Sequence, residues 1–227
     1  MLEPIKLFWR GFLNLPCAWL LSLQFVILIL SLITNASLTY RAFTWVLGVC
    51  VLLVIAKVIR QTPMFTFLGL FFVAGAVFFS SLILLGMNVV TVQILAHGFE
   101  ALAYFSAAYG LMRYMFADRY LTMDELFAAG AVFTLLAWGF AFLYSICQLL
   151  VPSSFVSSEV ATMQTWLDLL FLSFSVQSAT GLSDIMPTSP LARVITILQM
   201  FCGVMYLAVI VSRLIALQYI RNHEKGR

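Results

Sequence analysis

Seven residues, SATGLSD at 178–184, of which six are small or polar, interrupt the apolar C-terminal part of the chain and are the first candidates for chemistry. They overlap the end of an apolar stretch, Thr165–Ala179, that is too short to cross a bilayer and too apolar to remain in water. Non-helical backbone at membrane depth is tolerated only where protein buries it or where it lines a water-filled cavity. We therefore expect the loop around Gly181 to lie inside protein and to present backbone carbonyls to water or ions.

Ionisable residues inside apolar segments form a second group of candidates. Such groups are costly at membrane depth and are usually paired or functional. His97 and Glu100 are three residues apart and share a helix face, so they are candidates for a hydrogen-bonded pair against another helix, a proton sensor or a transport site. Asp168 lies in the short apolar stretch, where we expect it to brace the loop from behind.

The elements that must position these residues follow from the composition. The chain has 227 residues, of which 63% are hydrophobic and 9% are charged, whereas soluble domains carry about 25% charged residues. Continuous apolar runs, without alternating strands, predict an all-α integral membrane protein and no barrel. A span needs about 20 apolar residues, and six transmembrane helices are predicted at Cys17–Thr34, Ala42–Ala56, Met64–Leu85, Val89–Met112, Leu126–Val151 and Leu191–Leu217. The short stretch is then a re-entrant helix between helices five and six.

Positive charge predicts the orientation of these helices. Lysine and arginine concentrate on the cytoplasmic side of a membrane. With the N-terminus inside, ten of the 12 such residues lie inside, and Arg41 and Arg193 lie outside. This distribution predicts a multi-pass protein of the plasma (inner) membrane with both termini in the cytoplasm.

Two further patterns divide the chain. Aromatic and basic residues alternate near the N-terminus and predict a short helix on the inner leaflet, with Lys6, Phe8, Trp9, Arg10 and Phe12. The sequence TMDE, Thr122–Glu125, has the spacing of a capping box and predicts the start of the fifth span, so residues 113–125 are expected to form a cytoplasmic linker. Residues 1–121 are then a membrane scaffold of four helices with the N-terminal interfacial helix, and residues 122–227 form a second domain.

The sequence shows no pattern typical of an enzyme or a metal site. It has no HExxH motif, no Gly-rich phosphate loop and no serine nucleophile with partners, so we expect no enzymatic activity and no cofactor. The cysteines have no zinc or CxxC spacing and are interpreted as small buried hydrophobic residues: Cys17, Cys50, Cys147 and Cys202.

The second domain resembles a known family. A helix, a re-entrant pore helix, a filter loop and an inner helix follow one another in the tetrameric potassium-channel superfamily, and this domain is similar to its bacterial two-helix-pore ion channels. The family filter, TVGYGD, is followed by a proline and by a basic residue that opens the inner helix; Asp184, Pro187 and Arg193 match these places. Gly203 falls where the family carries a gating-hinge glycine. The resemblance covers about Thr122 to Leu217.

The filter departs from the family pattern. It reads Ala179, Thr180, Gly181, Leu182, Ser183 and Asp184, and of the two family glycines the first alone survives, as Gly181. Ala179 lacks the threonine hydroxyl of the innermost ring, and Leu182 lacks the aromatic hydroxyl that ties the filter to its pore helix. Ser183 would either adopt a left-handed conformation, at about 1 kcal/mol per subunit, or turn its carbonyl away. The expected filter is shorter, wider or softer, and TGLS is also similar to the single-glycine loops of Trk-type potassium transporters.

The resemblance implies roles for individual residues. Potassium or sodium would bind the carbonyls of Thr180, Gly181 and Leu182, because such filters replace the hydration shell of the ion with carbonyl oxygens. Trp166 and Asp168 would support the pore helix, and Asp184 would form an acidic ring or hydrogen-bond to Trp166. A hydrophobic gate is expected from side chains on one face of the inner helix: Leu207, Val211 and Leu214.

The resemblance therefore implies a homotetrameric channel for monovalent cations with an atypical filter. Because no span carries arginine at every third residue, we expect no strong voltage dependence. Neither a nucleic-acid partner nor a soluble ligand domain is expected. Two alternatives stay open: a non-conducting membrane scaffold that binds a partner, and a proton-coupled carrier that uses His97 and Glu100.

Overall fold

The computed structural model of the protein describes residues 16–33, 63–117, 123–157 and 163–225. The helices are α2 (Pro16–Ile33), α4 (Pro63–Leu84), α5 (Val90–Ala117), α6 (Met123–Leu150), α7 (Trp166–Gln177) and α8 (Pro190–Lys225). Two short strands, β1 (Phe155–Val156) and β2 (Met186–Pro187), pair antiparallel with Phe155 opposite Pro187. The described part of the chain is therefore almost entirely helical, as the apolar runs predict.

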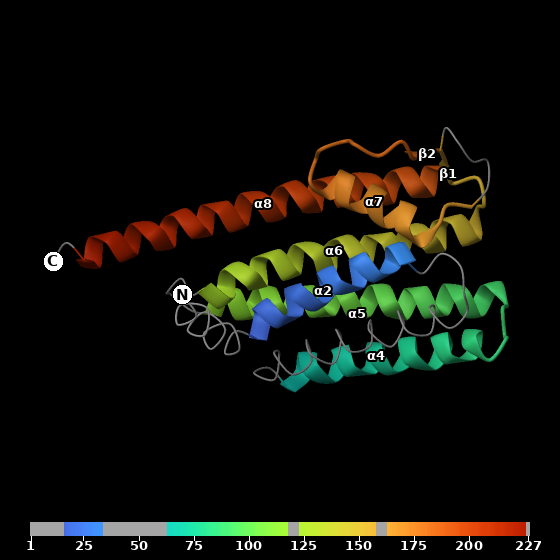
Figure 1. Ribbon diagram of the computed structural model, residues 1–227, viewed down its shortest axis with the longest axis horizontal. Helices are drawn as coiled ribbons and strands as arrows, with labels where there is room; N and C mark the ends of the chain where they lie inside the picture. Colours follow the sequence, from blue (N-terminus) through green and yellow to red (C-terminus); the bar gives the residue numbers. More distant parts are fainter. Residues whose placement is uncertain (1–15, 34–62, 118–122, 158–162, 226–227) are drawn as a thin grey trace.

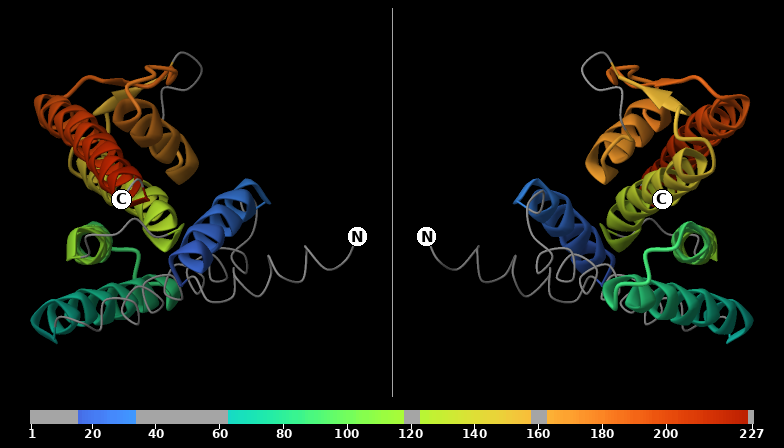
Figure 2. Two further views of the ribbon diagram at one scale, coloured as in Figure 1. Left: turned by 90° about the vertical axis from the view of Figure 1, so that its left-hand side faces the viewer. Right: turned by 90° about the vertical axis from the view of Figure 1, so that its right-hand side faces the viewer.

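The helices form a bundle with α5 between α4 and α6 (Figure 1). Helix α2 packs against α6, and the short helix α7 packs against both α6 and α8. Figure 2 shows α7 and α8 on one side of the bundle and α4 on the other. The C-terminal part of α8 extends beyond the other helices, at the end opposite the two strands. The loop that follows α7 is thus held beside the two long helices α6 and α8.

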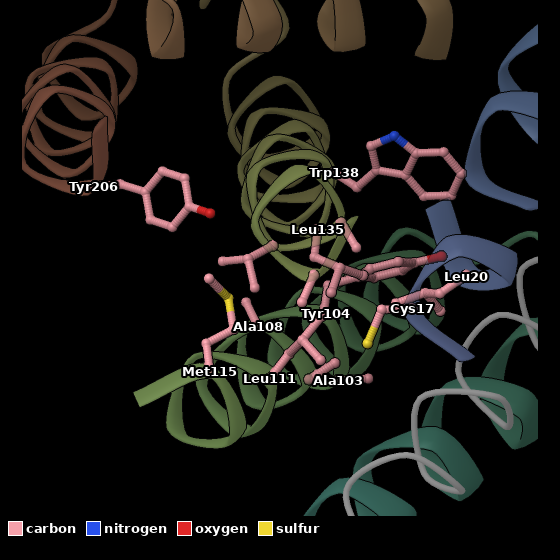
Figure 3. Close-up of a cluster of buried hydrophobic side chains, with 14 of the residues drawn as sticks. Cys17, Leu20, Ala103, Tyr104, Ala108, Leu111, Met115, Leu135, Trp138 and Tyr206 are labelled. Carbon is pink, nitrogen blue, oxygen red and sulfur yellow. The ribbon is translucent and has the colours of Figure 1, made fainter. Parts of the chain in front are cut away.

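A buried apolar cluster joins the two predicted domains. Small residues let α5 and α6 approach closely, as is typical of membrane helices: Ala103, Ala107, Ala108, Ala128 and Ala131. Larger side chains fill the space beside them, and Figure 3 shows Leu20 of α2 and Tyr206 of α8 entering the cluster from different sides. Helix α8 is therefore packed, through this cluster, against elements from the first half of the chain.

Among the described residues, three helices are long and apolar enough to cross a membrane. They contain the stretches Phe67–Leu84 in α4, Asp124–Leu150 in α6 and Pro190–Ala216 in α8. The apolar stretches of α2 and α7 are shorter, and the polar residues of α5 lower its hydropathy although it has 28 residues. The span Ala42–Ala56 and the N-terminal interfacial helix lie outside the described residues, so the count of six crossings stays a prediction.

Three sequence predictions change in detail. Residues 113–117 are not linker, because α5 continues to Ala117. Cys17 and Cys147 are buried as expected, but Cys202 is exposed because it lies beside the stripe of α8 that faces α6 and α7. Thr122 of the predicted capping box and Cys50 lie outside the described residues.

Candidate functional site

The N-terminus of α7 is fixed by a capping box that the sequence analysis did not identify. The Thr165 hydroxyl accepts from the Asp168 backbone N–H at 3.3 Å, and the Asp168 carboxylate accepts from the Thr165 backbone N–H at 3.0 Å. Asp168 is therefore a capping residue at the start of the helix, and the expectation that it braces the loop from behind is wrong. Trp166 packs against Phe142 of α6, with ring centroids 4.3 Å apart.

The C-terminus of α7 passes directly into the candidate loop. Ser178 is the C-cap, and its N–H bonds the Phe174 carbonyl at 2.9 Å. Ala179 then takes the left-handed conformation, with φ of 58°, which is the usual way to end a helix. Gly181 also has a positive φ, 66°, whereas Ser183 does not. The strain expected at Ser183 therefore falls on Ala179 instead.

Ser175 holds the loop against the last turn of α7. Its carbonyl accepts from the N–H groups of Thr180 at 3.1 Å and of Gly181 at 3.4 Å. Its hydroxyl oxygen accepts from the N–H of Ser183 at 3.1 Å. Three of the loop's peptide N–H groups thus point toward α7.

This arrangement sets the direction of three carbonyls. In a planar trans peptide the N–H of one residue and the C=O of the residue before it point in opposite directions, and the described chain has no cis bond. The carbonyls of Ala179, Thr180 and Leu182 therefore point away from α7. Residues 179–182 are exposed in the single subunit. A row of carbonyl oxygens that points to open space is what coordination of a monovalent cation requires.

The exit of the loop is tied to the two-stranded sheet. The Asp184 carboxylate accepts from the Ser157 hydroxyl at 2.7 Å, so the predicted hydrogen bond to Trp166 is wrong. The Ser183 hydroxyl accepts from the Ile185 N–H at 3.2 Å. Arg193 donates to the Pro187 carbonyl at 3.2 Å, which joins the start of α8 to β2. Asp184 is exposed, so its carboxylate remains accessible to cations.

Helix α8 touches α7 at Gly203. A Cβ there would overlap the carbonyl oxygen of Gln177 and lie 3.0 Å from its carbonyl carbon and Cα. The structure thus gives Gly203 a packing role, and its role as a hinge stays a prediction. Leu207 and Val211 of the predicted gate are exposed in the single subunit, whereas Leu214 packs against the apolar cluster. Leu207 and Val211 are therefore freer than Leu214 to line a passage.

His97 and Glu100 form the predicted pair. His97 Nδ1 lies 2.9 Å from the Glu100 carboxylate, which also accepts from the Ser80 hydroxyl of α4 at 3.1 Å. The His97 ring lies 5.7 Å from the ring of Phe142. The pair thus joins α4, α5 and α6, and neither residue has a described hydrogen bond to the loop 178–184.

We predict that His97→Ala lowers stability and leaves ion flux intact. The substitution removes one partly buried hydrogen bond, which contributes about 1 kcal/mol, while Glu100 keeps its bond to Ser80. Thermal unfolding and flux into liposomes check this prediction. Loss of flux at unchanged stability would instead favour the proton-coupled carrier.

Several polar residues of the site were not singled out from the sequence. Ser175 anchors the loop, and a buried group links α6, α7 and α8: Tyr144, Ser173, Gln177 and Gln199. The signal in the sequence was Gln199, an amide within a long apolar span, because buried polar groups in a membrane need partners.

Comparison with known proteins gives a family match in the C-terminal part of the chain. Residues 126–218 match the family model described as an ion channel. No curated protein and no solved structure gives a significant match. The matched segment contains most of α6, all of α7 with its loop, and α8 as far as residue 218. The match supports a membrane-embedded ion-channel domain in this part of the chain, which is a non-enzymatic class.

Proposed function

We propose that the protein is a homotetrameric channel for monovalent cations whose passage is lined by residues 179–183. Four loops would meet on one axis, and their carbonyls would replace the hydration shell of potassium or sodium. The proposed filter has one glycine and is less selective than a filter with two. The protein would lie in the plasma (inner) membrane with both termini in the cytoplasm.

The observation that carries this proposal is the direction of the loop's peptide groups. The N–H groups of Thr180, Gly181 and Ser183 are bonded to Ser175, which leaves the opposite side of the backbone to carbonyl oxygens. The C-terminal end of α7 adds to this preference, because the C-terminus of a helix carries a partial negative charge of about half an elementary charge. Asp184 adds a carboxylate at the loop's exit.

The surface of α8 supports assembly of several copies. One stripe of α8 is buried against α6 and α7, and it includes Ala192, Gln199, Gly203, Tyr206 and Ile210. Large apolar side chains on the other faces are exposed in the single subunit: Val194, Ile197, Leu198, Met200, Phe201, Val204 and Met205. Lipid and the neighbouring copies would cover these faces. Contacts within this chain leave the loop open on one side, as a shared axial passage requires.

The test is ion flux in liposomes with wild type and Gly181→Val. Gly181 has φ of 66°, and a Cβ there would meet no atom of the same subunit within 4 Å. Valine would nevertheless strain the backbone by about 1–2 kcal/mol or more in each copy. We expect flux well above empty liposomes for wild type and flux near that background for the variant.

Gly86→Val is the matched control. Gly86 in the turn between α4 and α5 also has a positive φ, 96°, and free space around its Cβ position. The same strain placed there should lower stability and leave flux through the folded protein unchanged. Wild-type flux equal to that of empty liposomes at several pH values and voltages would contradict the channel and favour the non-conducting scaffold.

A further inference from the structure

Gln199 is a fully buried amide in the first third of α8, and it contacts both α6 and α7. The Tyr144 hydroxyl of α6 donates to its Oε1 at 2.5 Å. Its Nε2 donates to the carbonyl of Ser173 in α7 at 3.0 Å and to the Ser173 hydroxyl oxygen at 2.6 Å. A further contact of 3.3 Å joins Nε2 to Gln177 Oε1. One side chain of the inner helix is thus bonded to both helices that flank it.

The partners of Gln199 are themselves fixed. The Ser173 hydroxyl donates to the Ala137 carbonyl of α6 at 2.6 Å, which leaves its oxygen free to accept from Gln199. Gln177 Nε2 donates to the Phe133 carbonyl of α6 at 2.7 Å. The hydrogen bonds therefore determine the positions of residues 173 and 177 relative to α6 and α8 together.

The residue between these two positions is Ser175, which accepts all three loop N–H bonds. A shift of the last turn of α7 would move Ser175 and, with it, the peptide groups of Thr180, Gly181 and Ser183. Gly203 adds a backbone contact to the same turn one helical turn further along α8. The end of α7 thus determines the shape of the loop, and α8 determines the position of the end of α7.

Burial energy alone does not explain an amide at this position. An apolar side chain of similar volume would fill the site without the cost of taking a polar group out of water. Hydrogen bonds differ from apolar contacts in being directional, so a fully satisfied buried network specifies one arrangement of the helices. What the amide adds at residue 199 is therefore a defined position for α7.

We propose that Gln199 is the positioning residue through which α8 holds the loop 178–184 in its ion-coordinating shape. It acts through Ser173, Gln177 and Ser175, and it touches no permeant ion itself. The inference rests on the proposed function where ion selectivity is measured. The measurement of the loop's hydrogen–deuterium exchange does not depend on conduction.

The first experiment measures hydrogen–deuterium exchange of the peptide that covers residues 178–184, in full-length protein in lipid nanodiscs. We expect Gln199→Leu to increase the exchange rate of this peptide about five- to tenfold, because the variant loses the hydrogen bonds that fix the last turn of α7, to which the loop is bonded. Tyr144→Phe removes one hydroxyl and one bond to Gln199, so a smaller increase of about two- to fivefold is expected.

Gln24→Leu is the matched control. Gln24 of α2 is equally buried, accepts from the Thr134 hydroxyl at 2.5 Å and contacts the Ala131 carbonyl at 3.5 Å, but it bonds no residue of α7. It should leave exchange at 178–184 unchanged. Wild-type exchange in Gln199→Leu, or an equal increase in Gln24→Leu, overturns the proposal. If Gln199→Leu does not fold, Tyr144→Phe against Gln24→Leu decides by the same criterion.

The second readout is the potassium-to-sodium permeability ratio in liposomes. The ratio should change several-fold in Gln199→Leu and stay at the wild-type value in Gln24→Leu. A wild type that carries no flux would refute the proposed function, and the exchange experiment would still decide the role of Gln199. Normal flux with an unchanged ratio and unchanged exchange would refute the positioning role alone.

Discussion

Replacing Gly203 by alanine is expected to move α8 away from the end of α7, so that the loop 178–184 loses its shape. The added Cβ would overlap the Gln177 carbonyl oxygen and approach two further backbone atoms to 3.0 Å. Backbone atoms cannot rotate away as a side chain can, so one helix must move. Overpacking of this kind costs about 1–3 kcal/mol, which exceeds the gain of up to about 1 kcal/mol from replacing glycine within a helix. Thermal unfolding and liposome flux measure the two consequences.

Gly98→Ala provides the comparison for this prediction. Gly98 lies within α5, and a Cβ there would meet no atom within 4 Å. The same substitution should therefore raise stability by about 0.5–1 kcal/mol and leave flux unchanged. A Gly203→Ala protein as stable and as active as Gly98→Ala would show that the close approach at residue 203 does not matter.

The positions of the helices could be predicted because bilayer thickness limits their length. The apolar stretch Thr165–Ala179 corresponds to α7 with its caps, and α4 and α5 are separate helices, as the predicted spans Met64–Leu85 and Val89–Met112 require. The loop could also be predicted, because a polar segment that follows a short apolar helix must lie where protein or water can satisfy its backbone. These features depend on local composition, which the sequence contains directly.

The partners of individual side chains could not be predicted in the same way. Asp168 bonds its own helix N-terminus and Asp184 bonds Ser157, which is 27 residues away in the chain. Which residue takes the left-handed conformation depends on where α7 ends, so strain falls on Ala179 and not on Ser183. The exposure of Cys202 depends on which face of α8 meets α7. The partner of Asp184 and the exposure of Cys202 follow from packing between segments distant in sequence, whereas Asp168 and Ala179 depend on where α7 begins and ends.

Replacing Arg213 by methionine is expected to destabilise the end of the bundle opposite the strands. The Arg213 guanidinium lies 3.5 Å from the Glu125 carboxylate of α6, and both side chains are mostly buried. It also donates to the Met115 carbonyl and lies 4.7 Å from the ring of Phe116, both in α5. Removing one member of a buried ion pair costs about 3–5 kcal/mol because the other charge loses its partner. Thermal unfolding should therefore show a large decrease in stability.

Arg193→Met and a double variant separate the ion pair from general effects of charge. Arg193 lies on the same helix but is exposed, so its loss should change stability by about 0.5 kcal/mol or less. Glu125→Gln combined with Arg213→Met removes both charges of the pair and should be more stable than the sum of the single variants predicts, by about 0.5–3 kcal/mol. Strict additivity would mean that Arg213 stabilises the bundle through contacts other than Glu125, among them Met115 and Phe116. A real coupling would make this ion pair a connection between α6 and α8, whereas the contacts of Arg213 with Met115 and Phe116 connect α8 to α5.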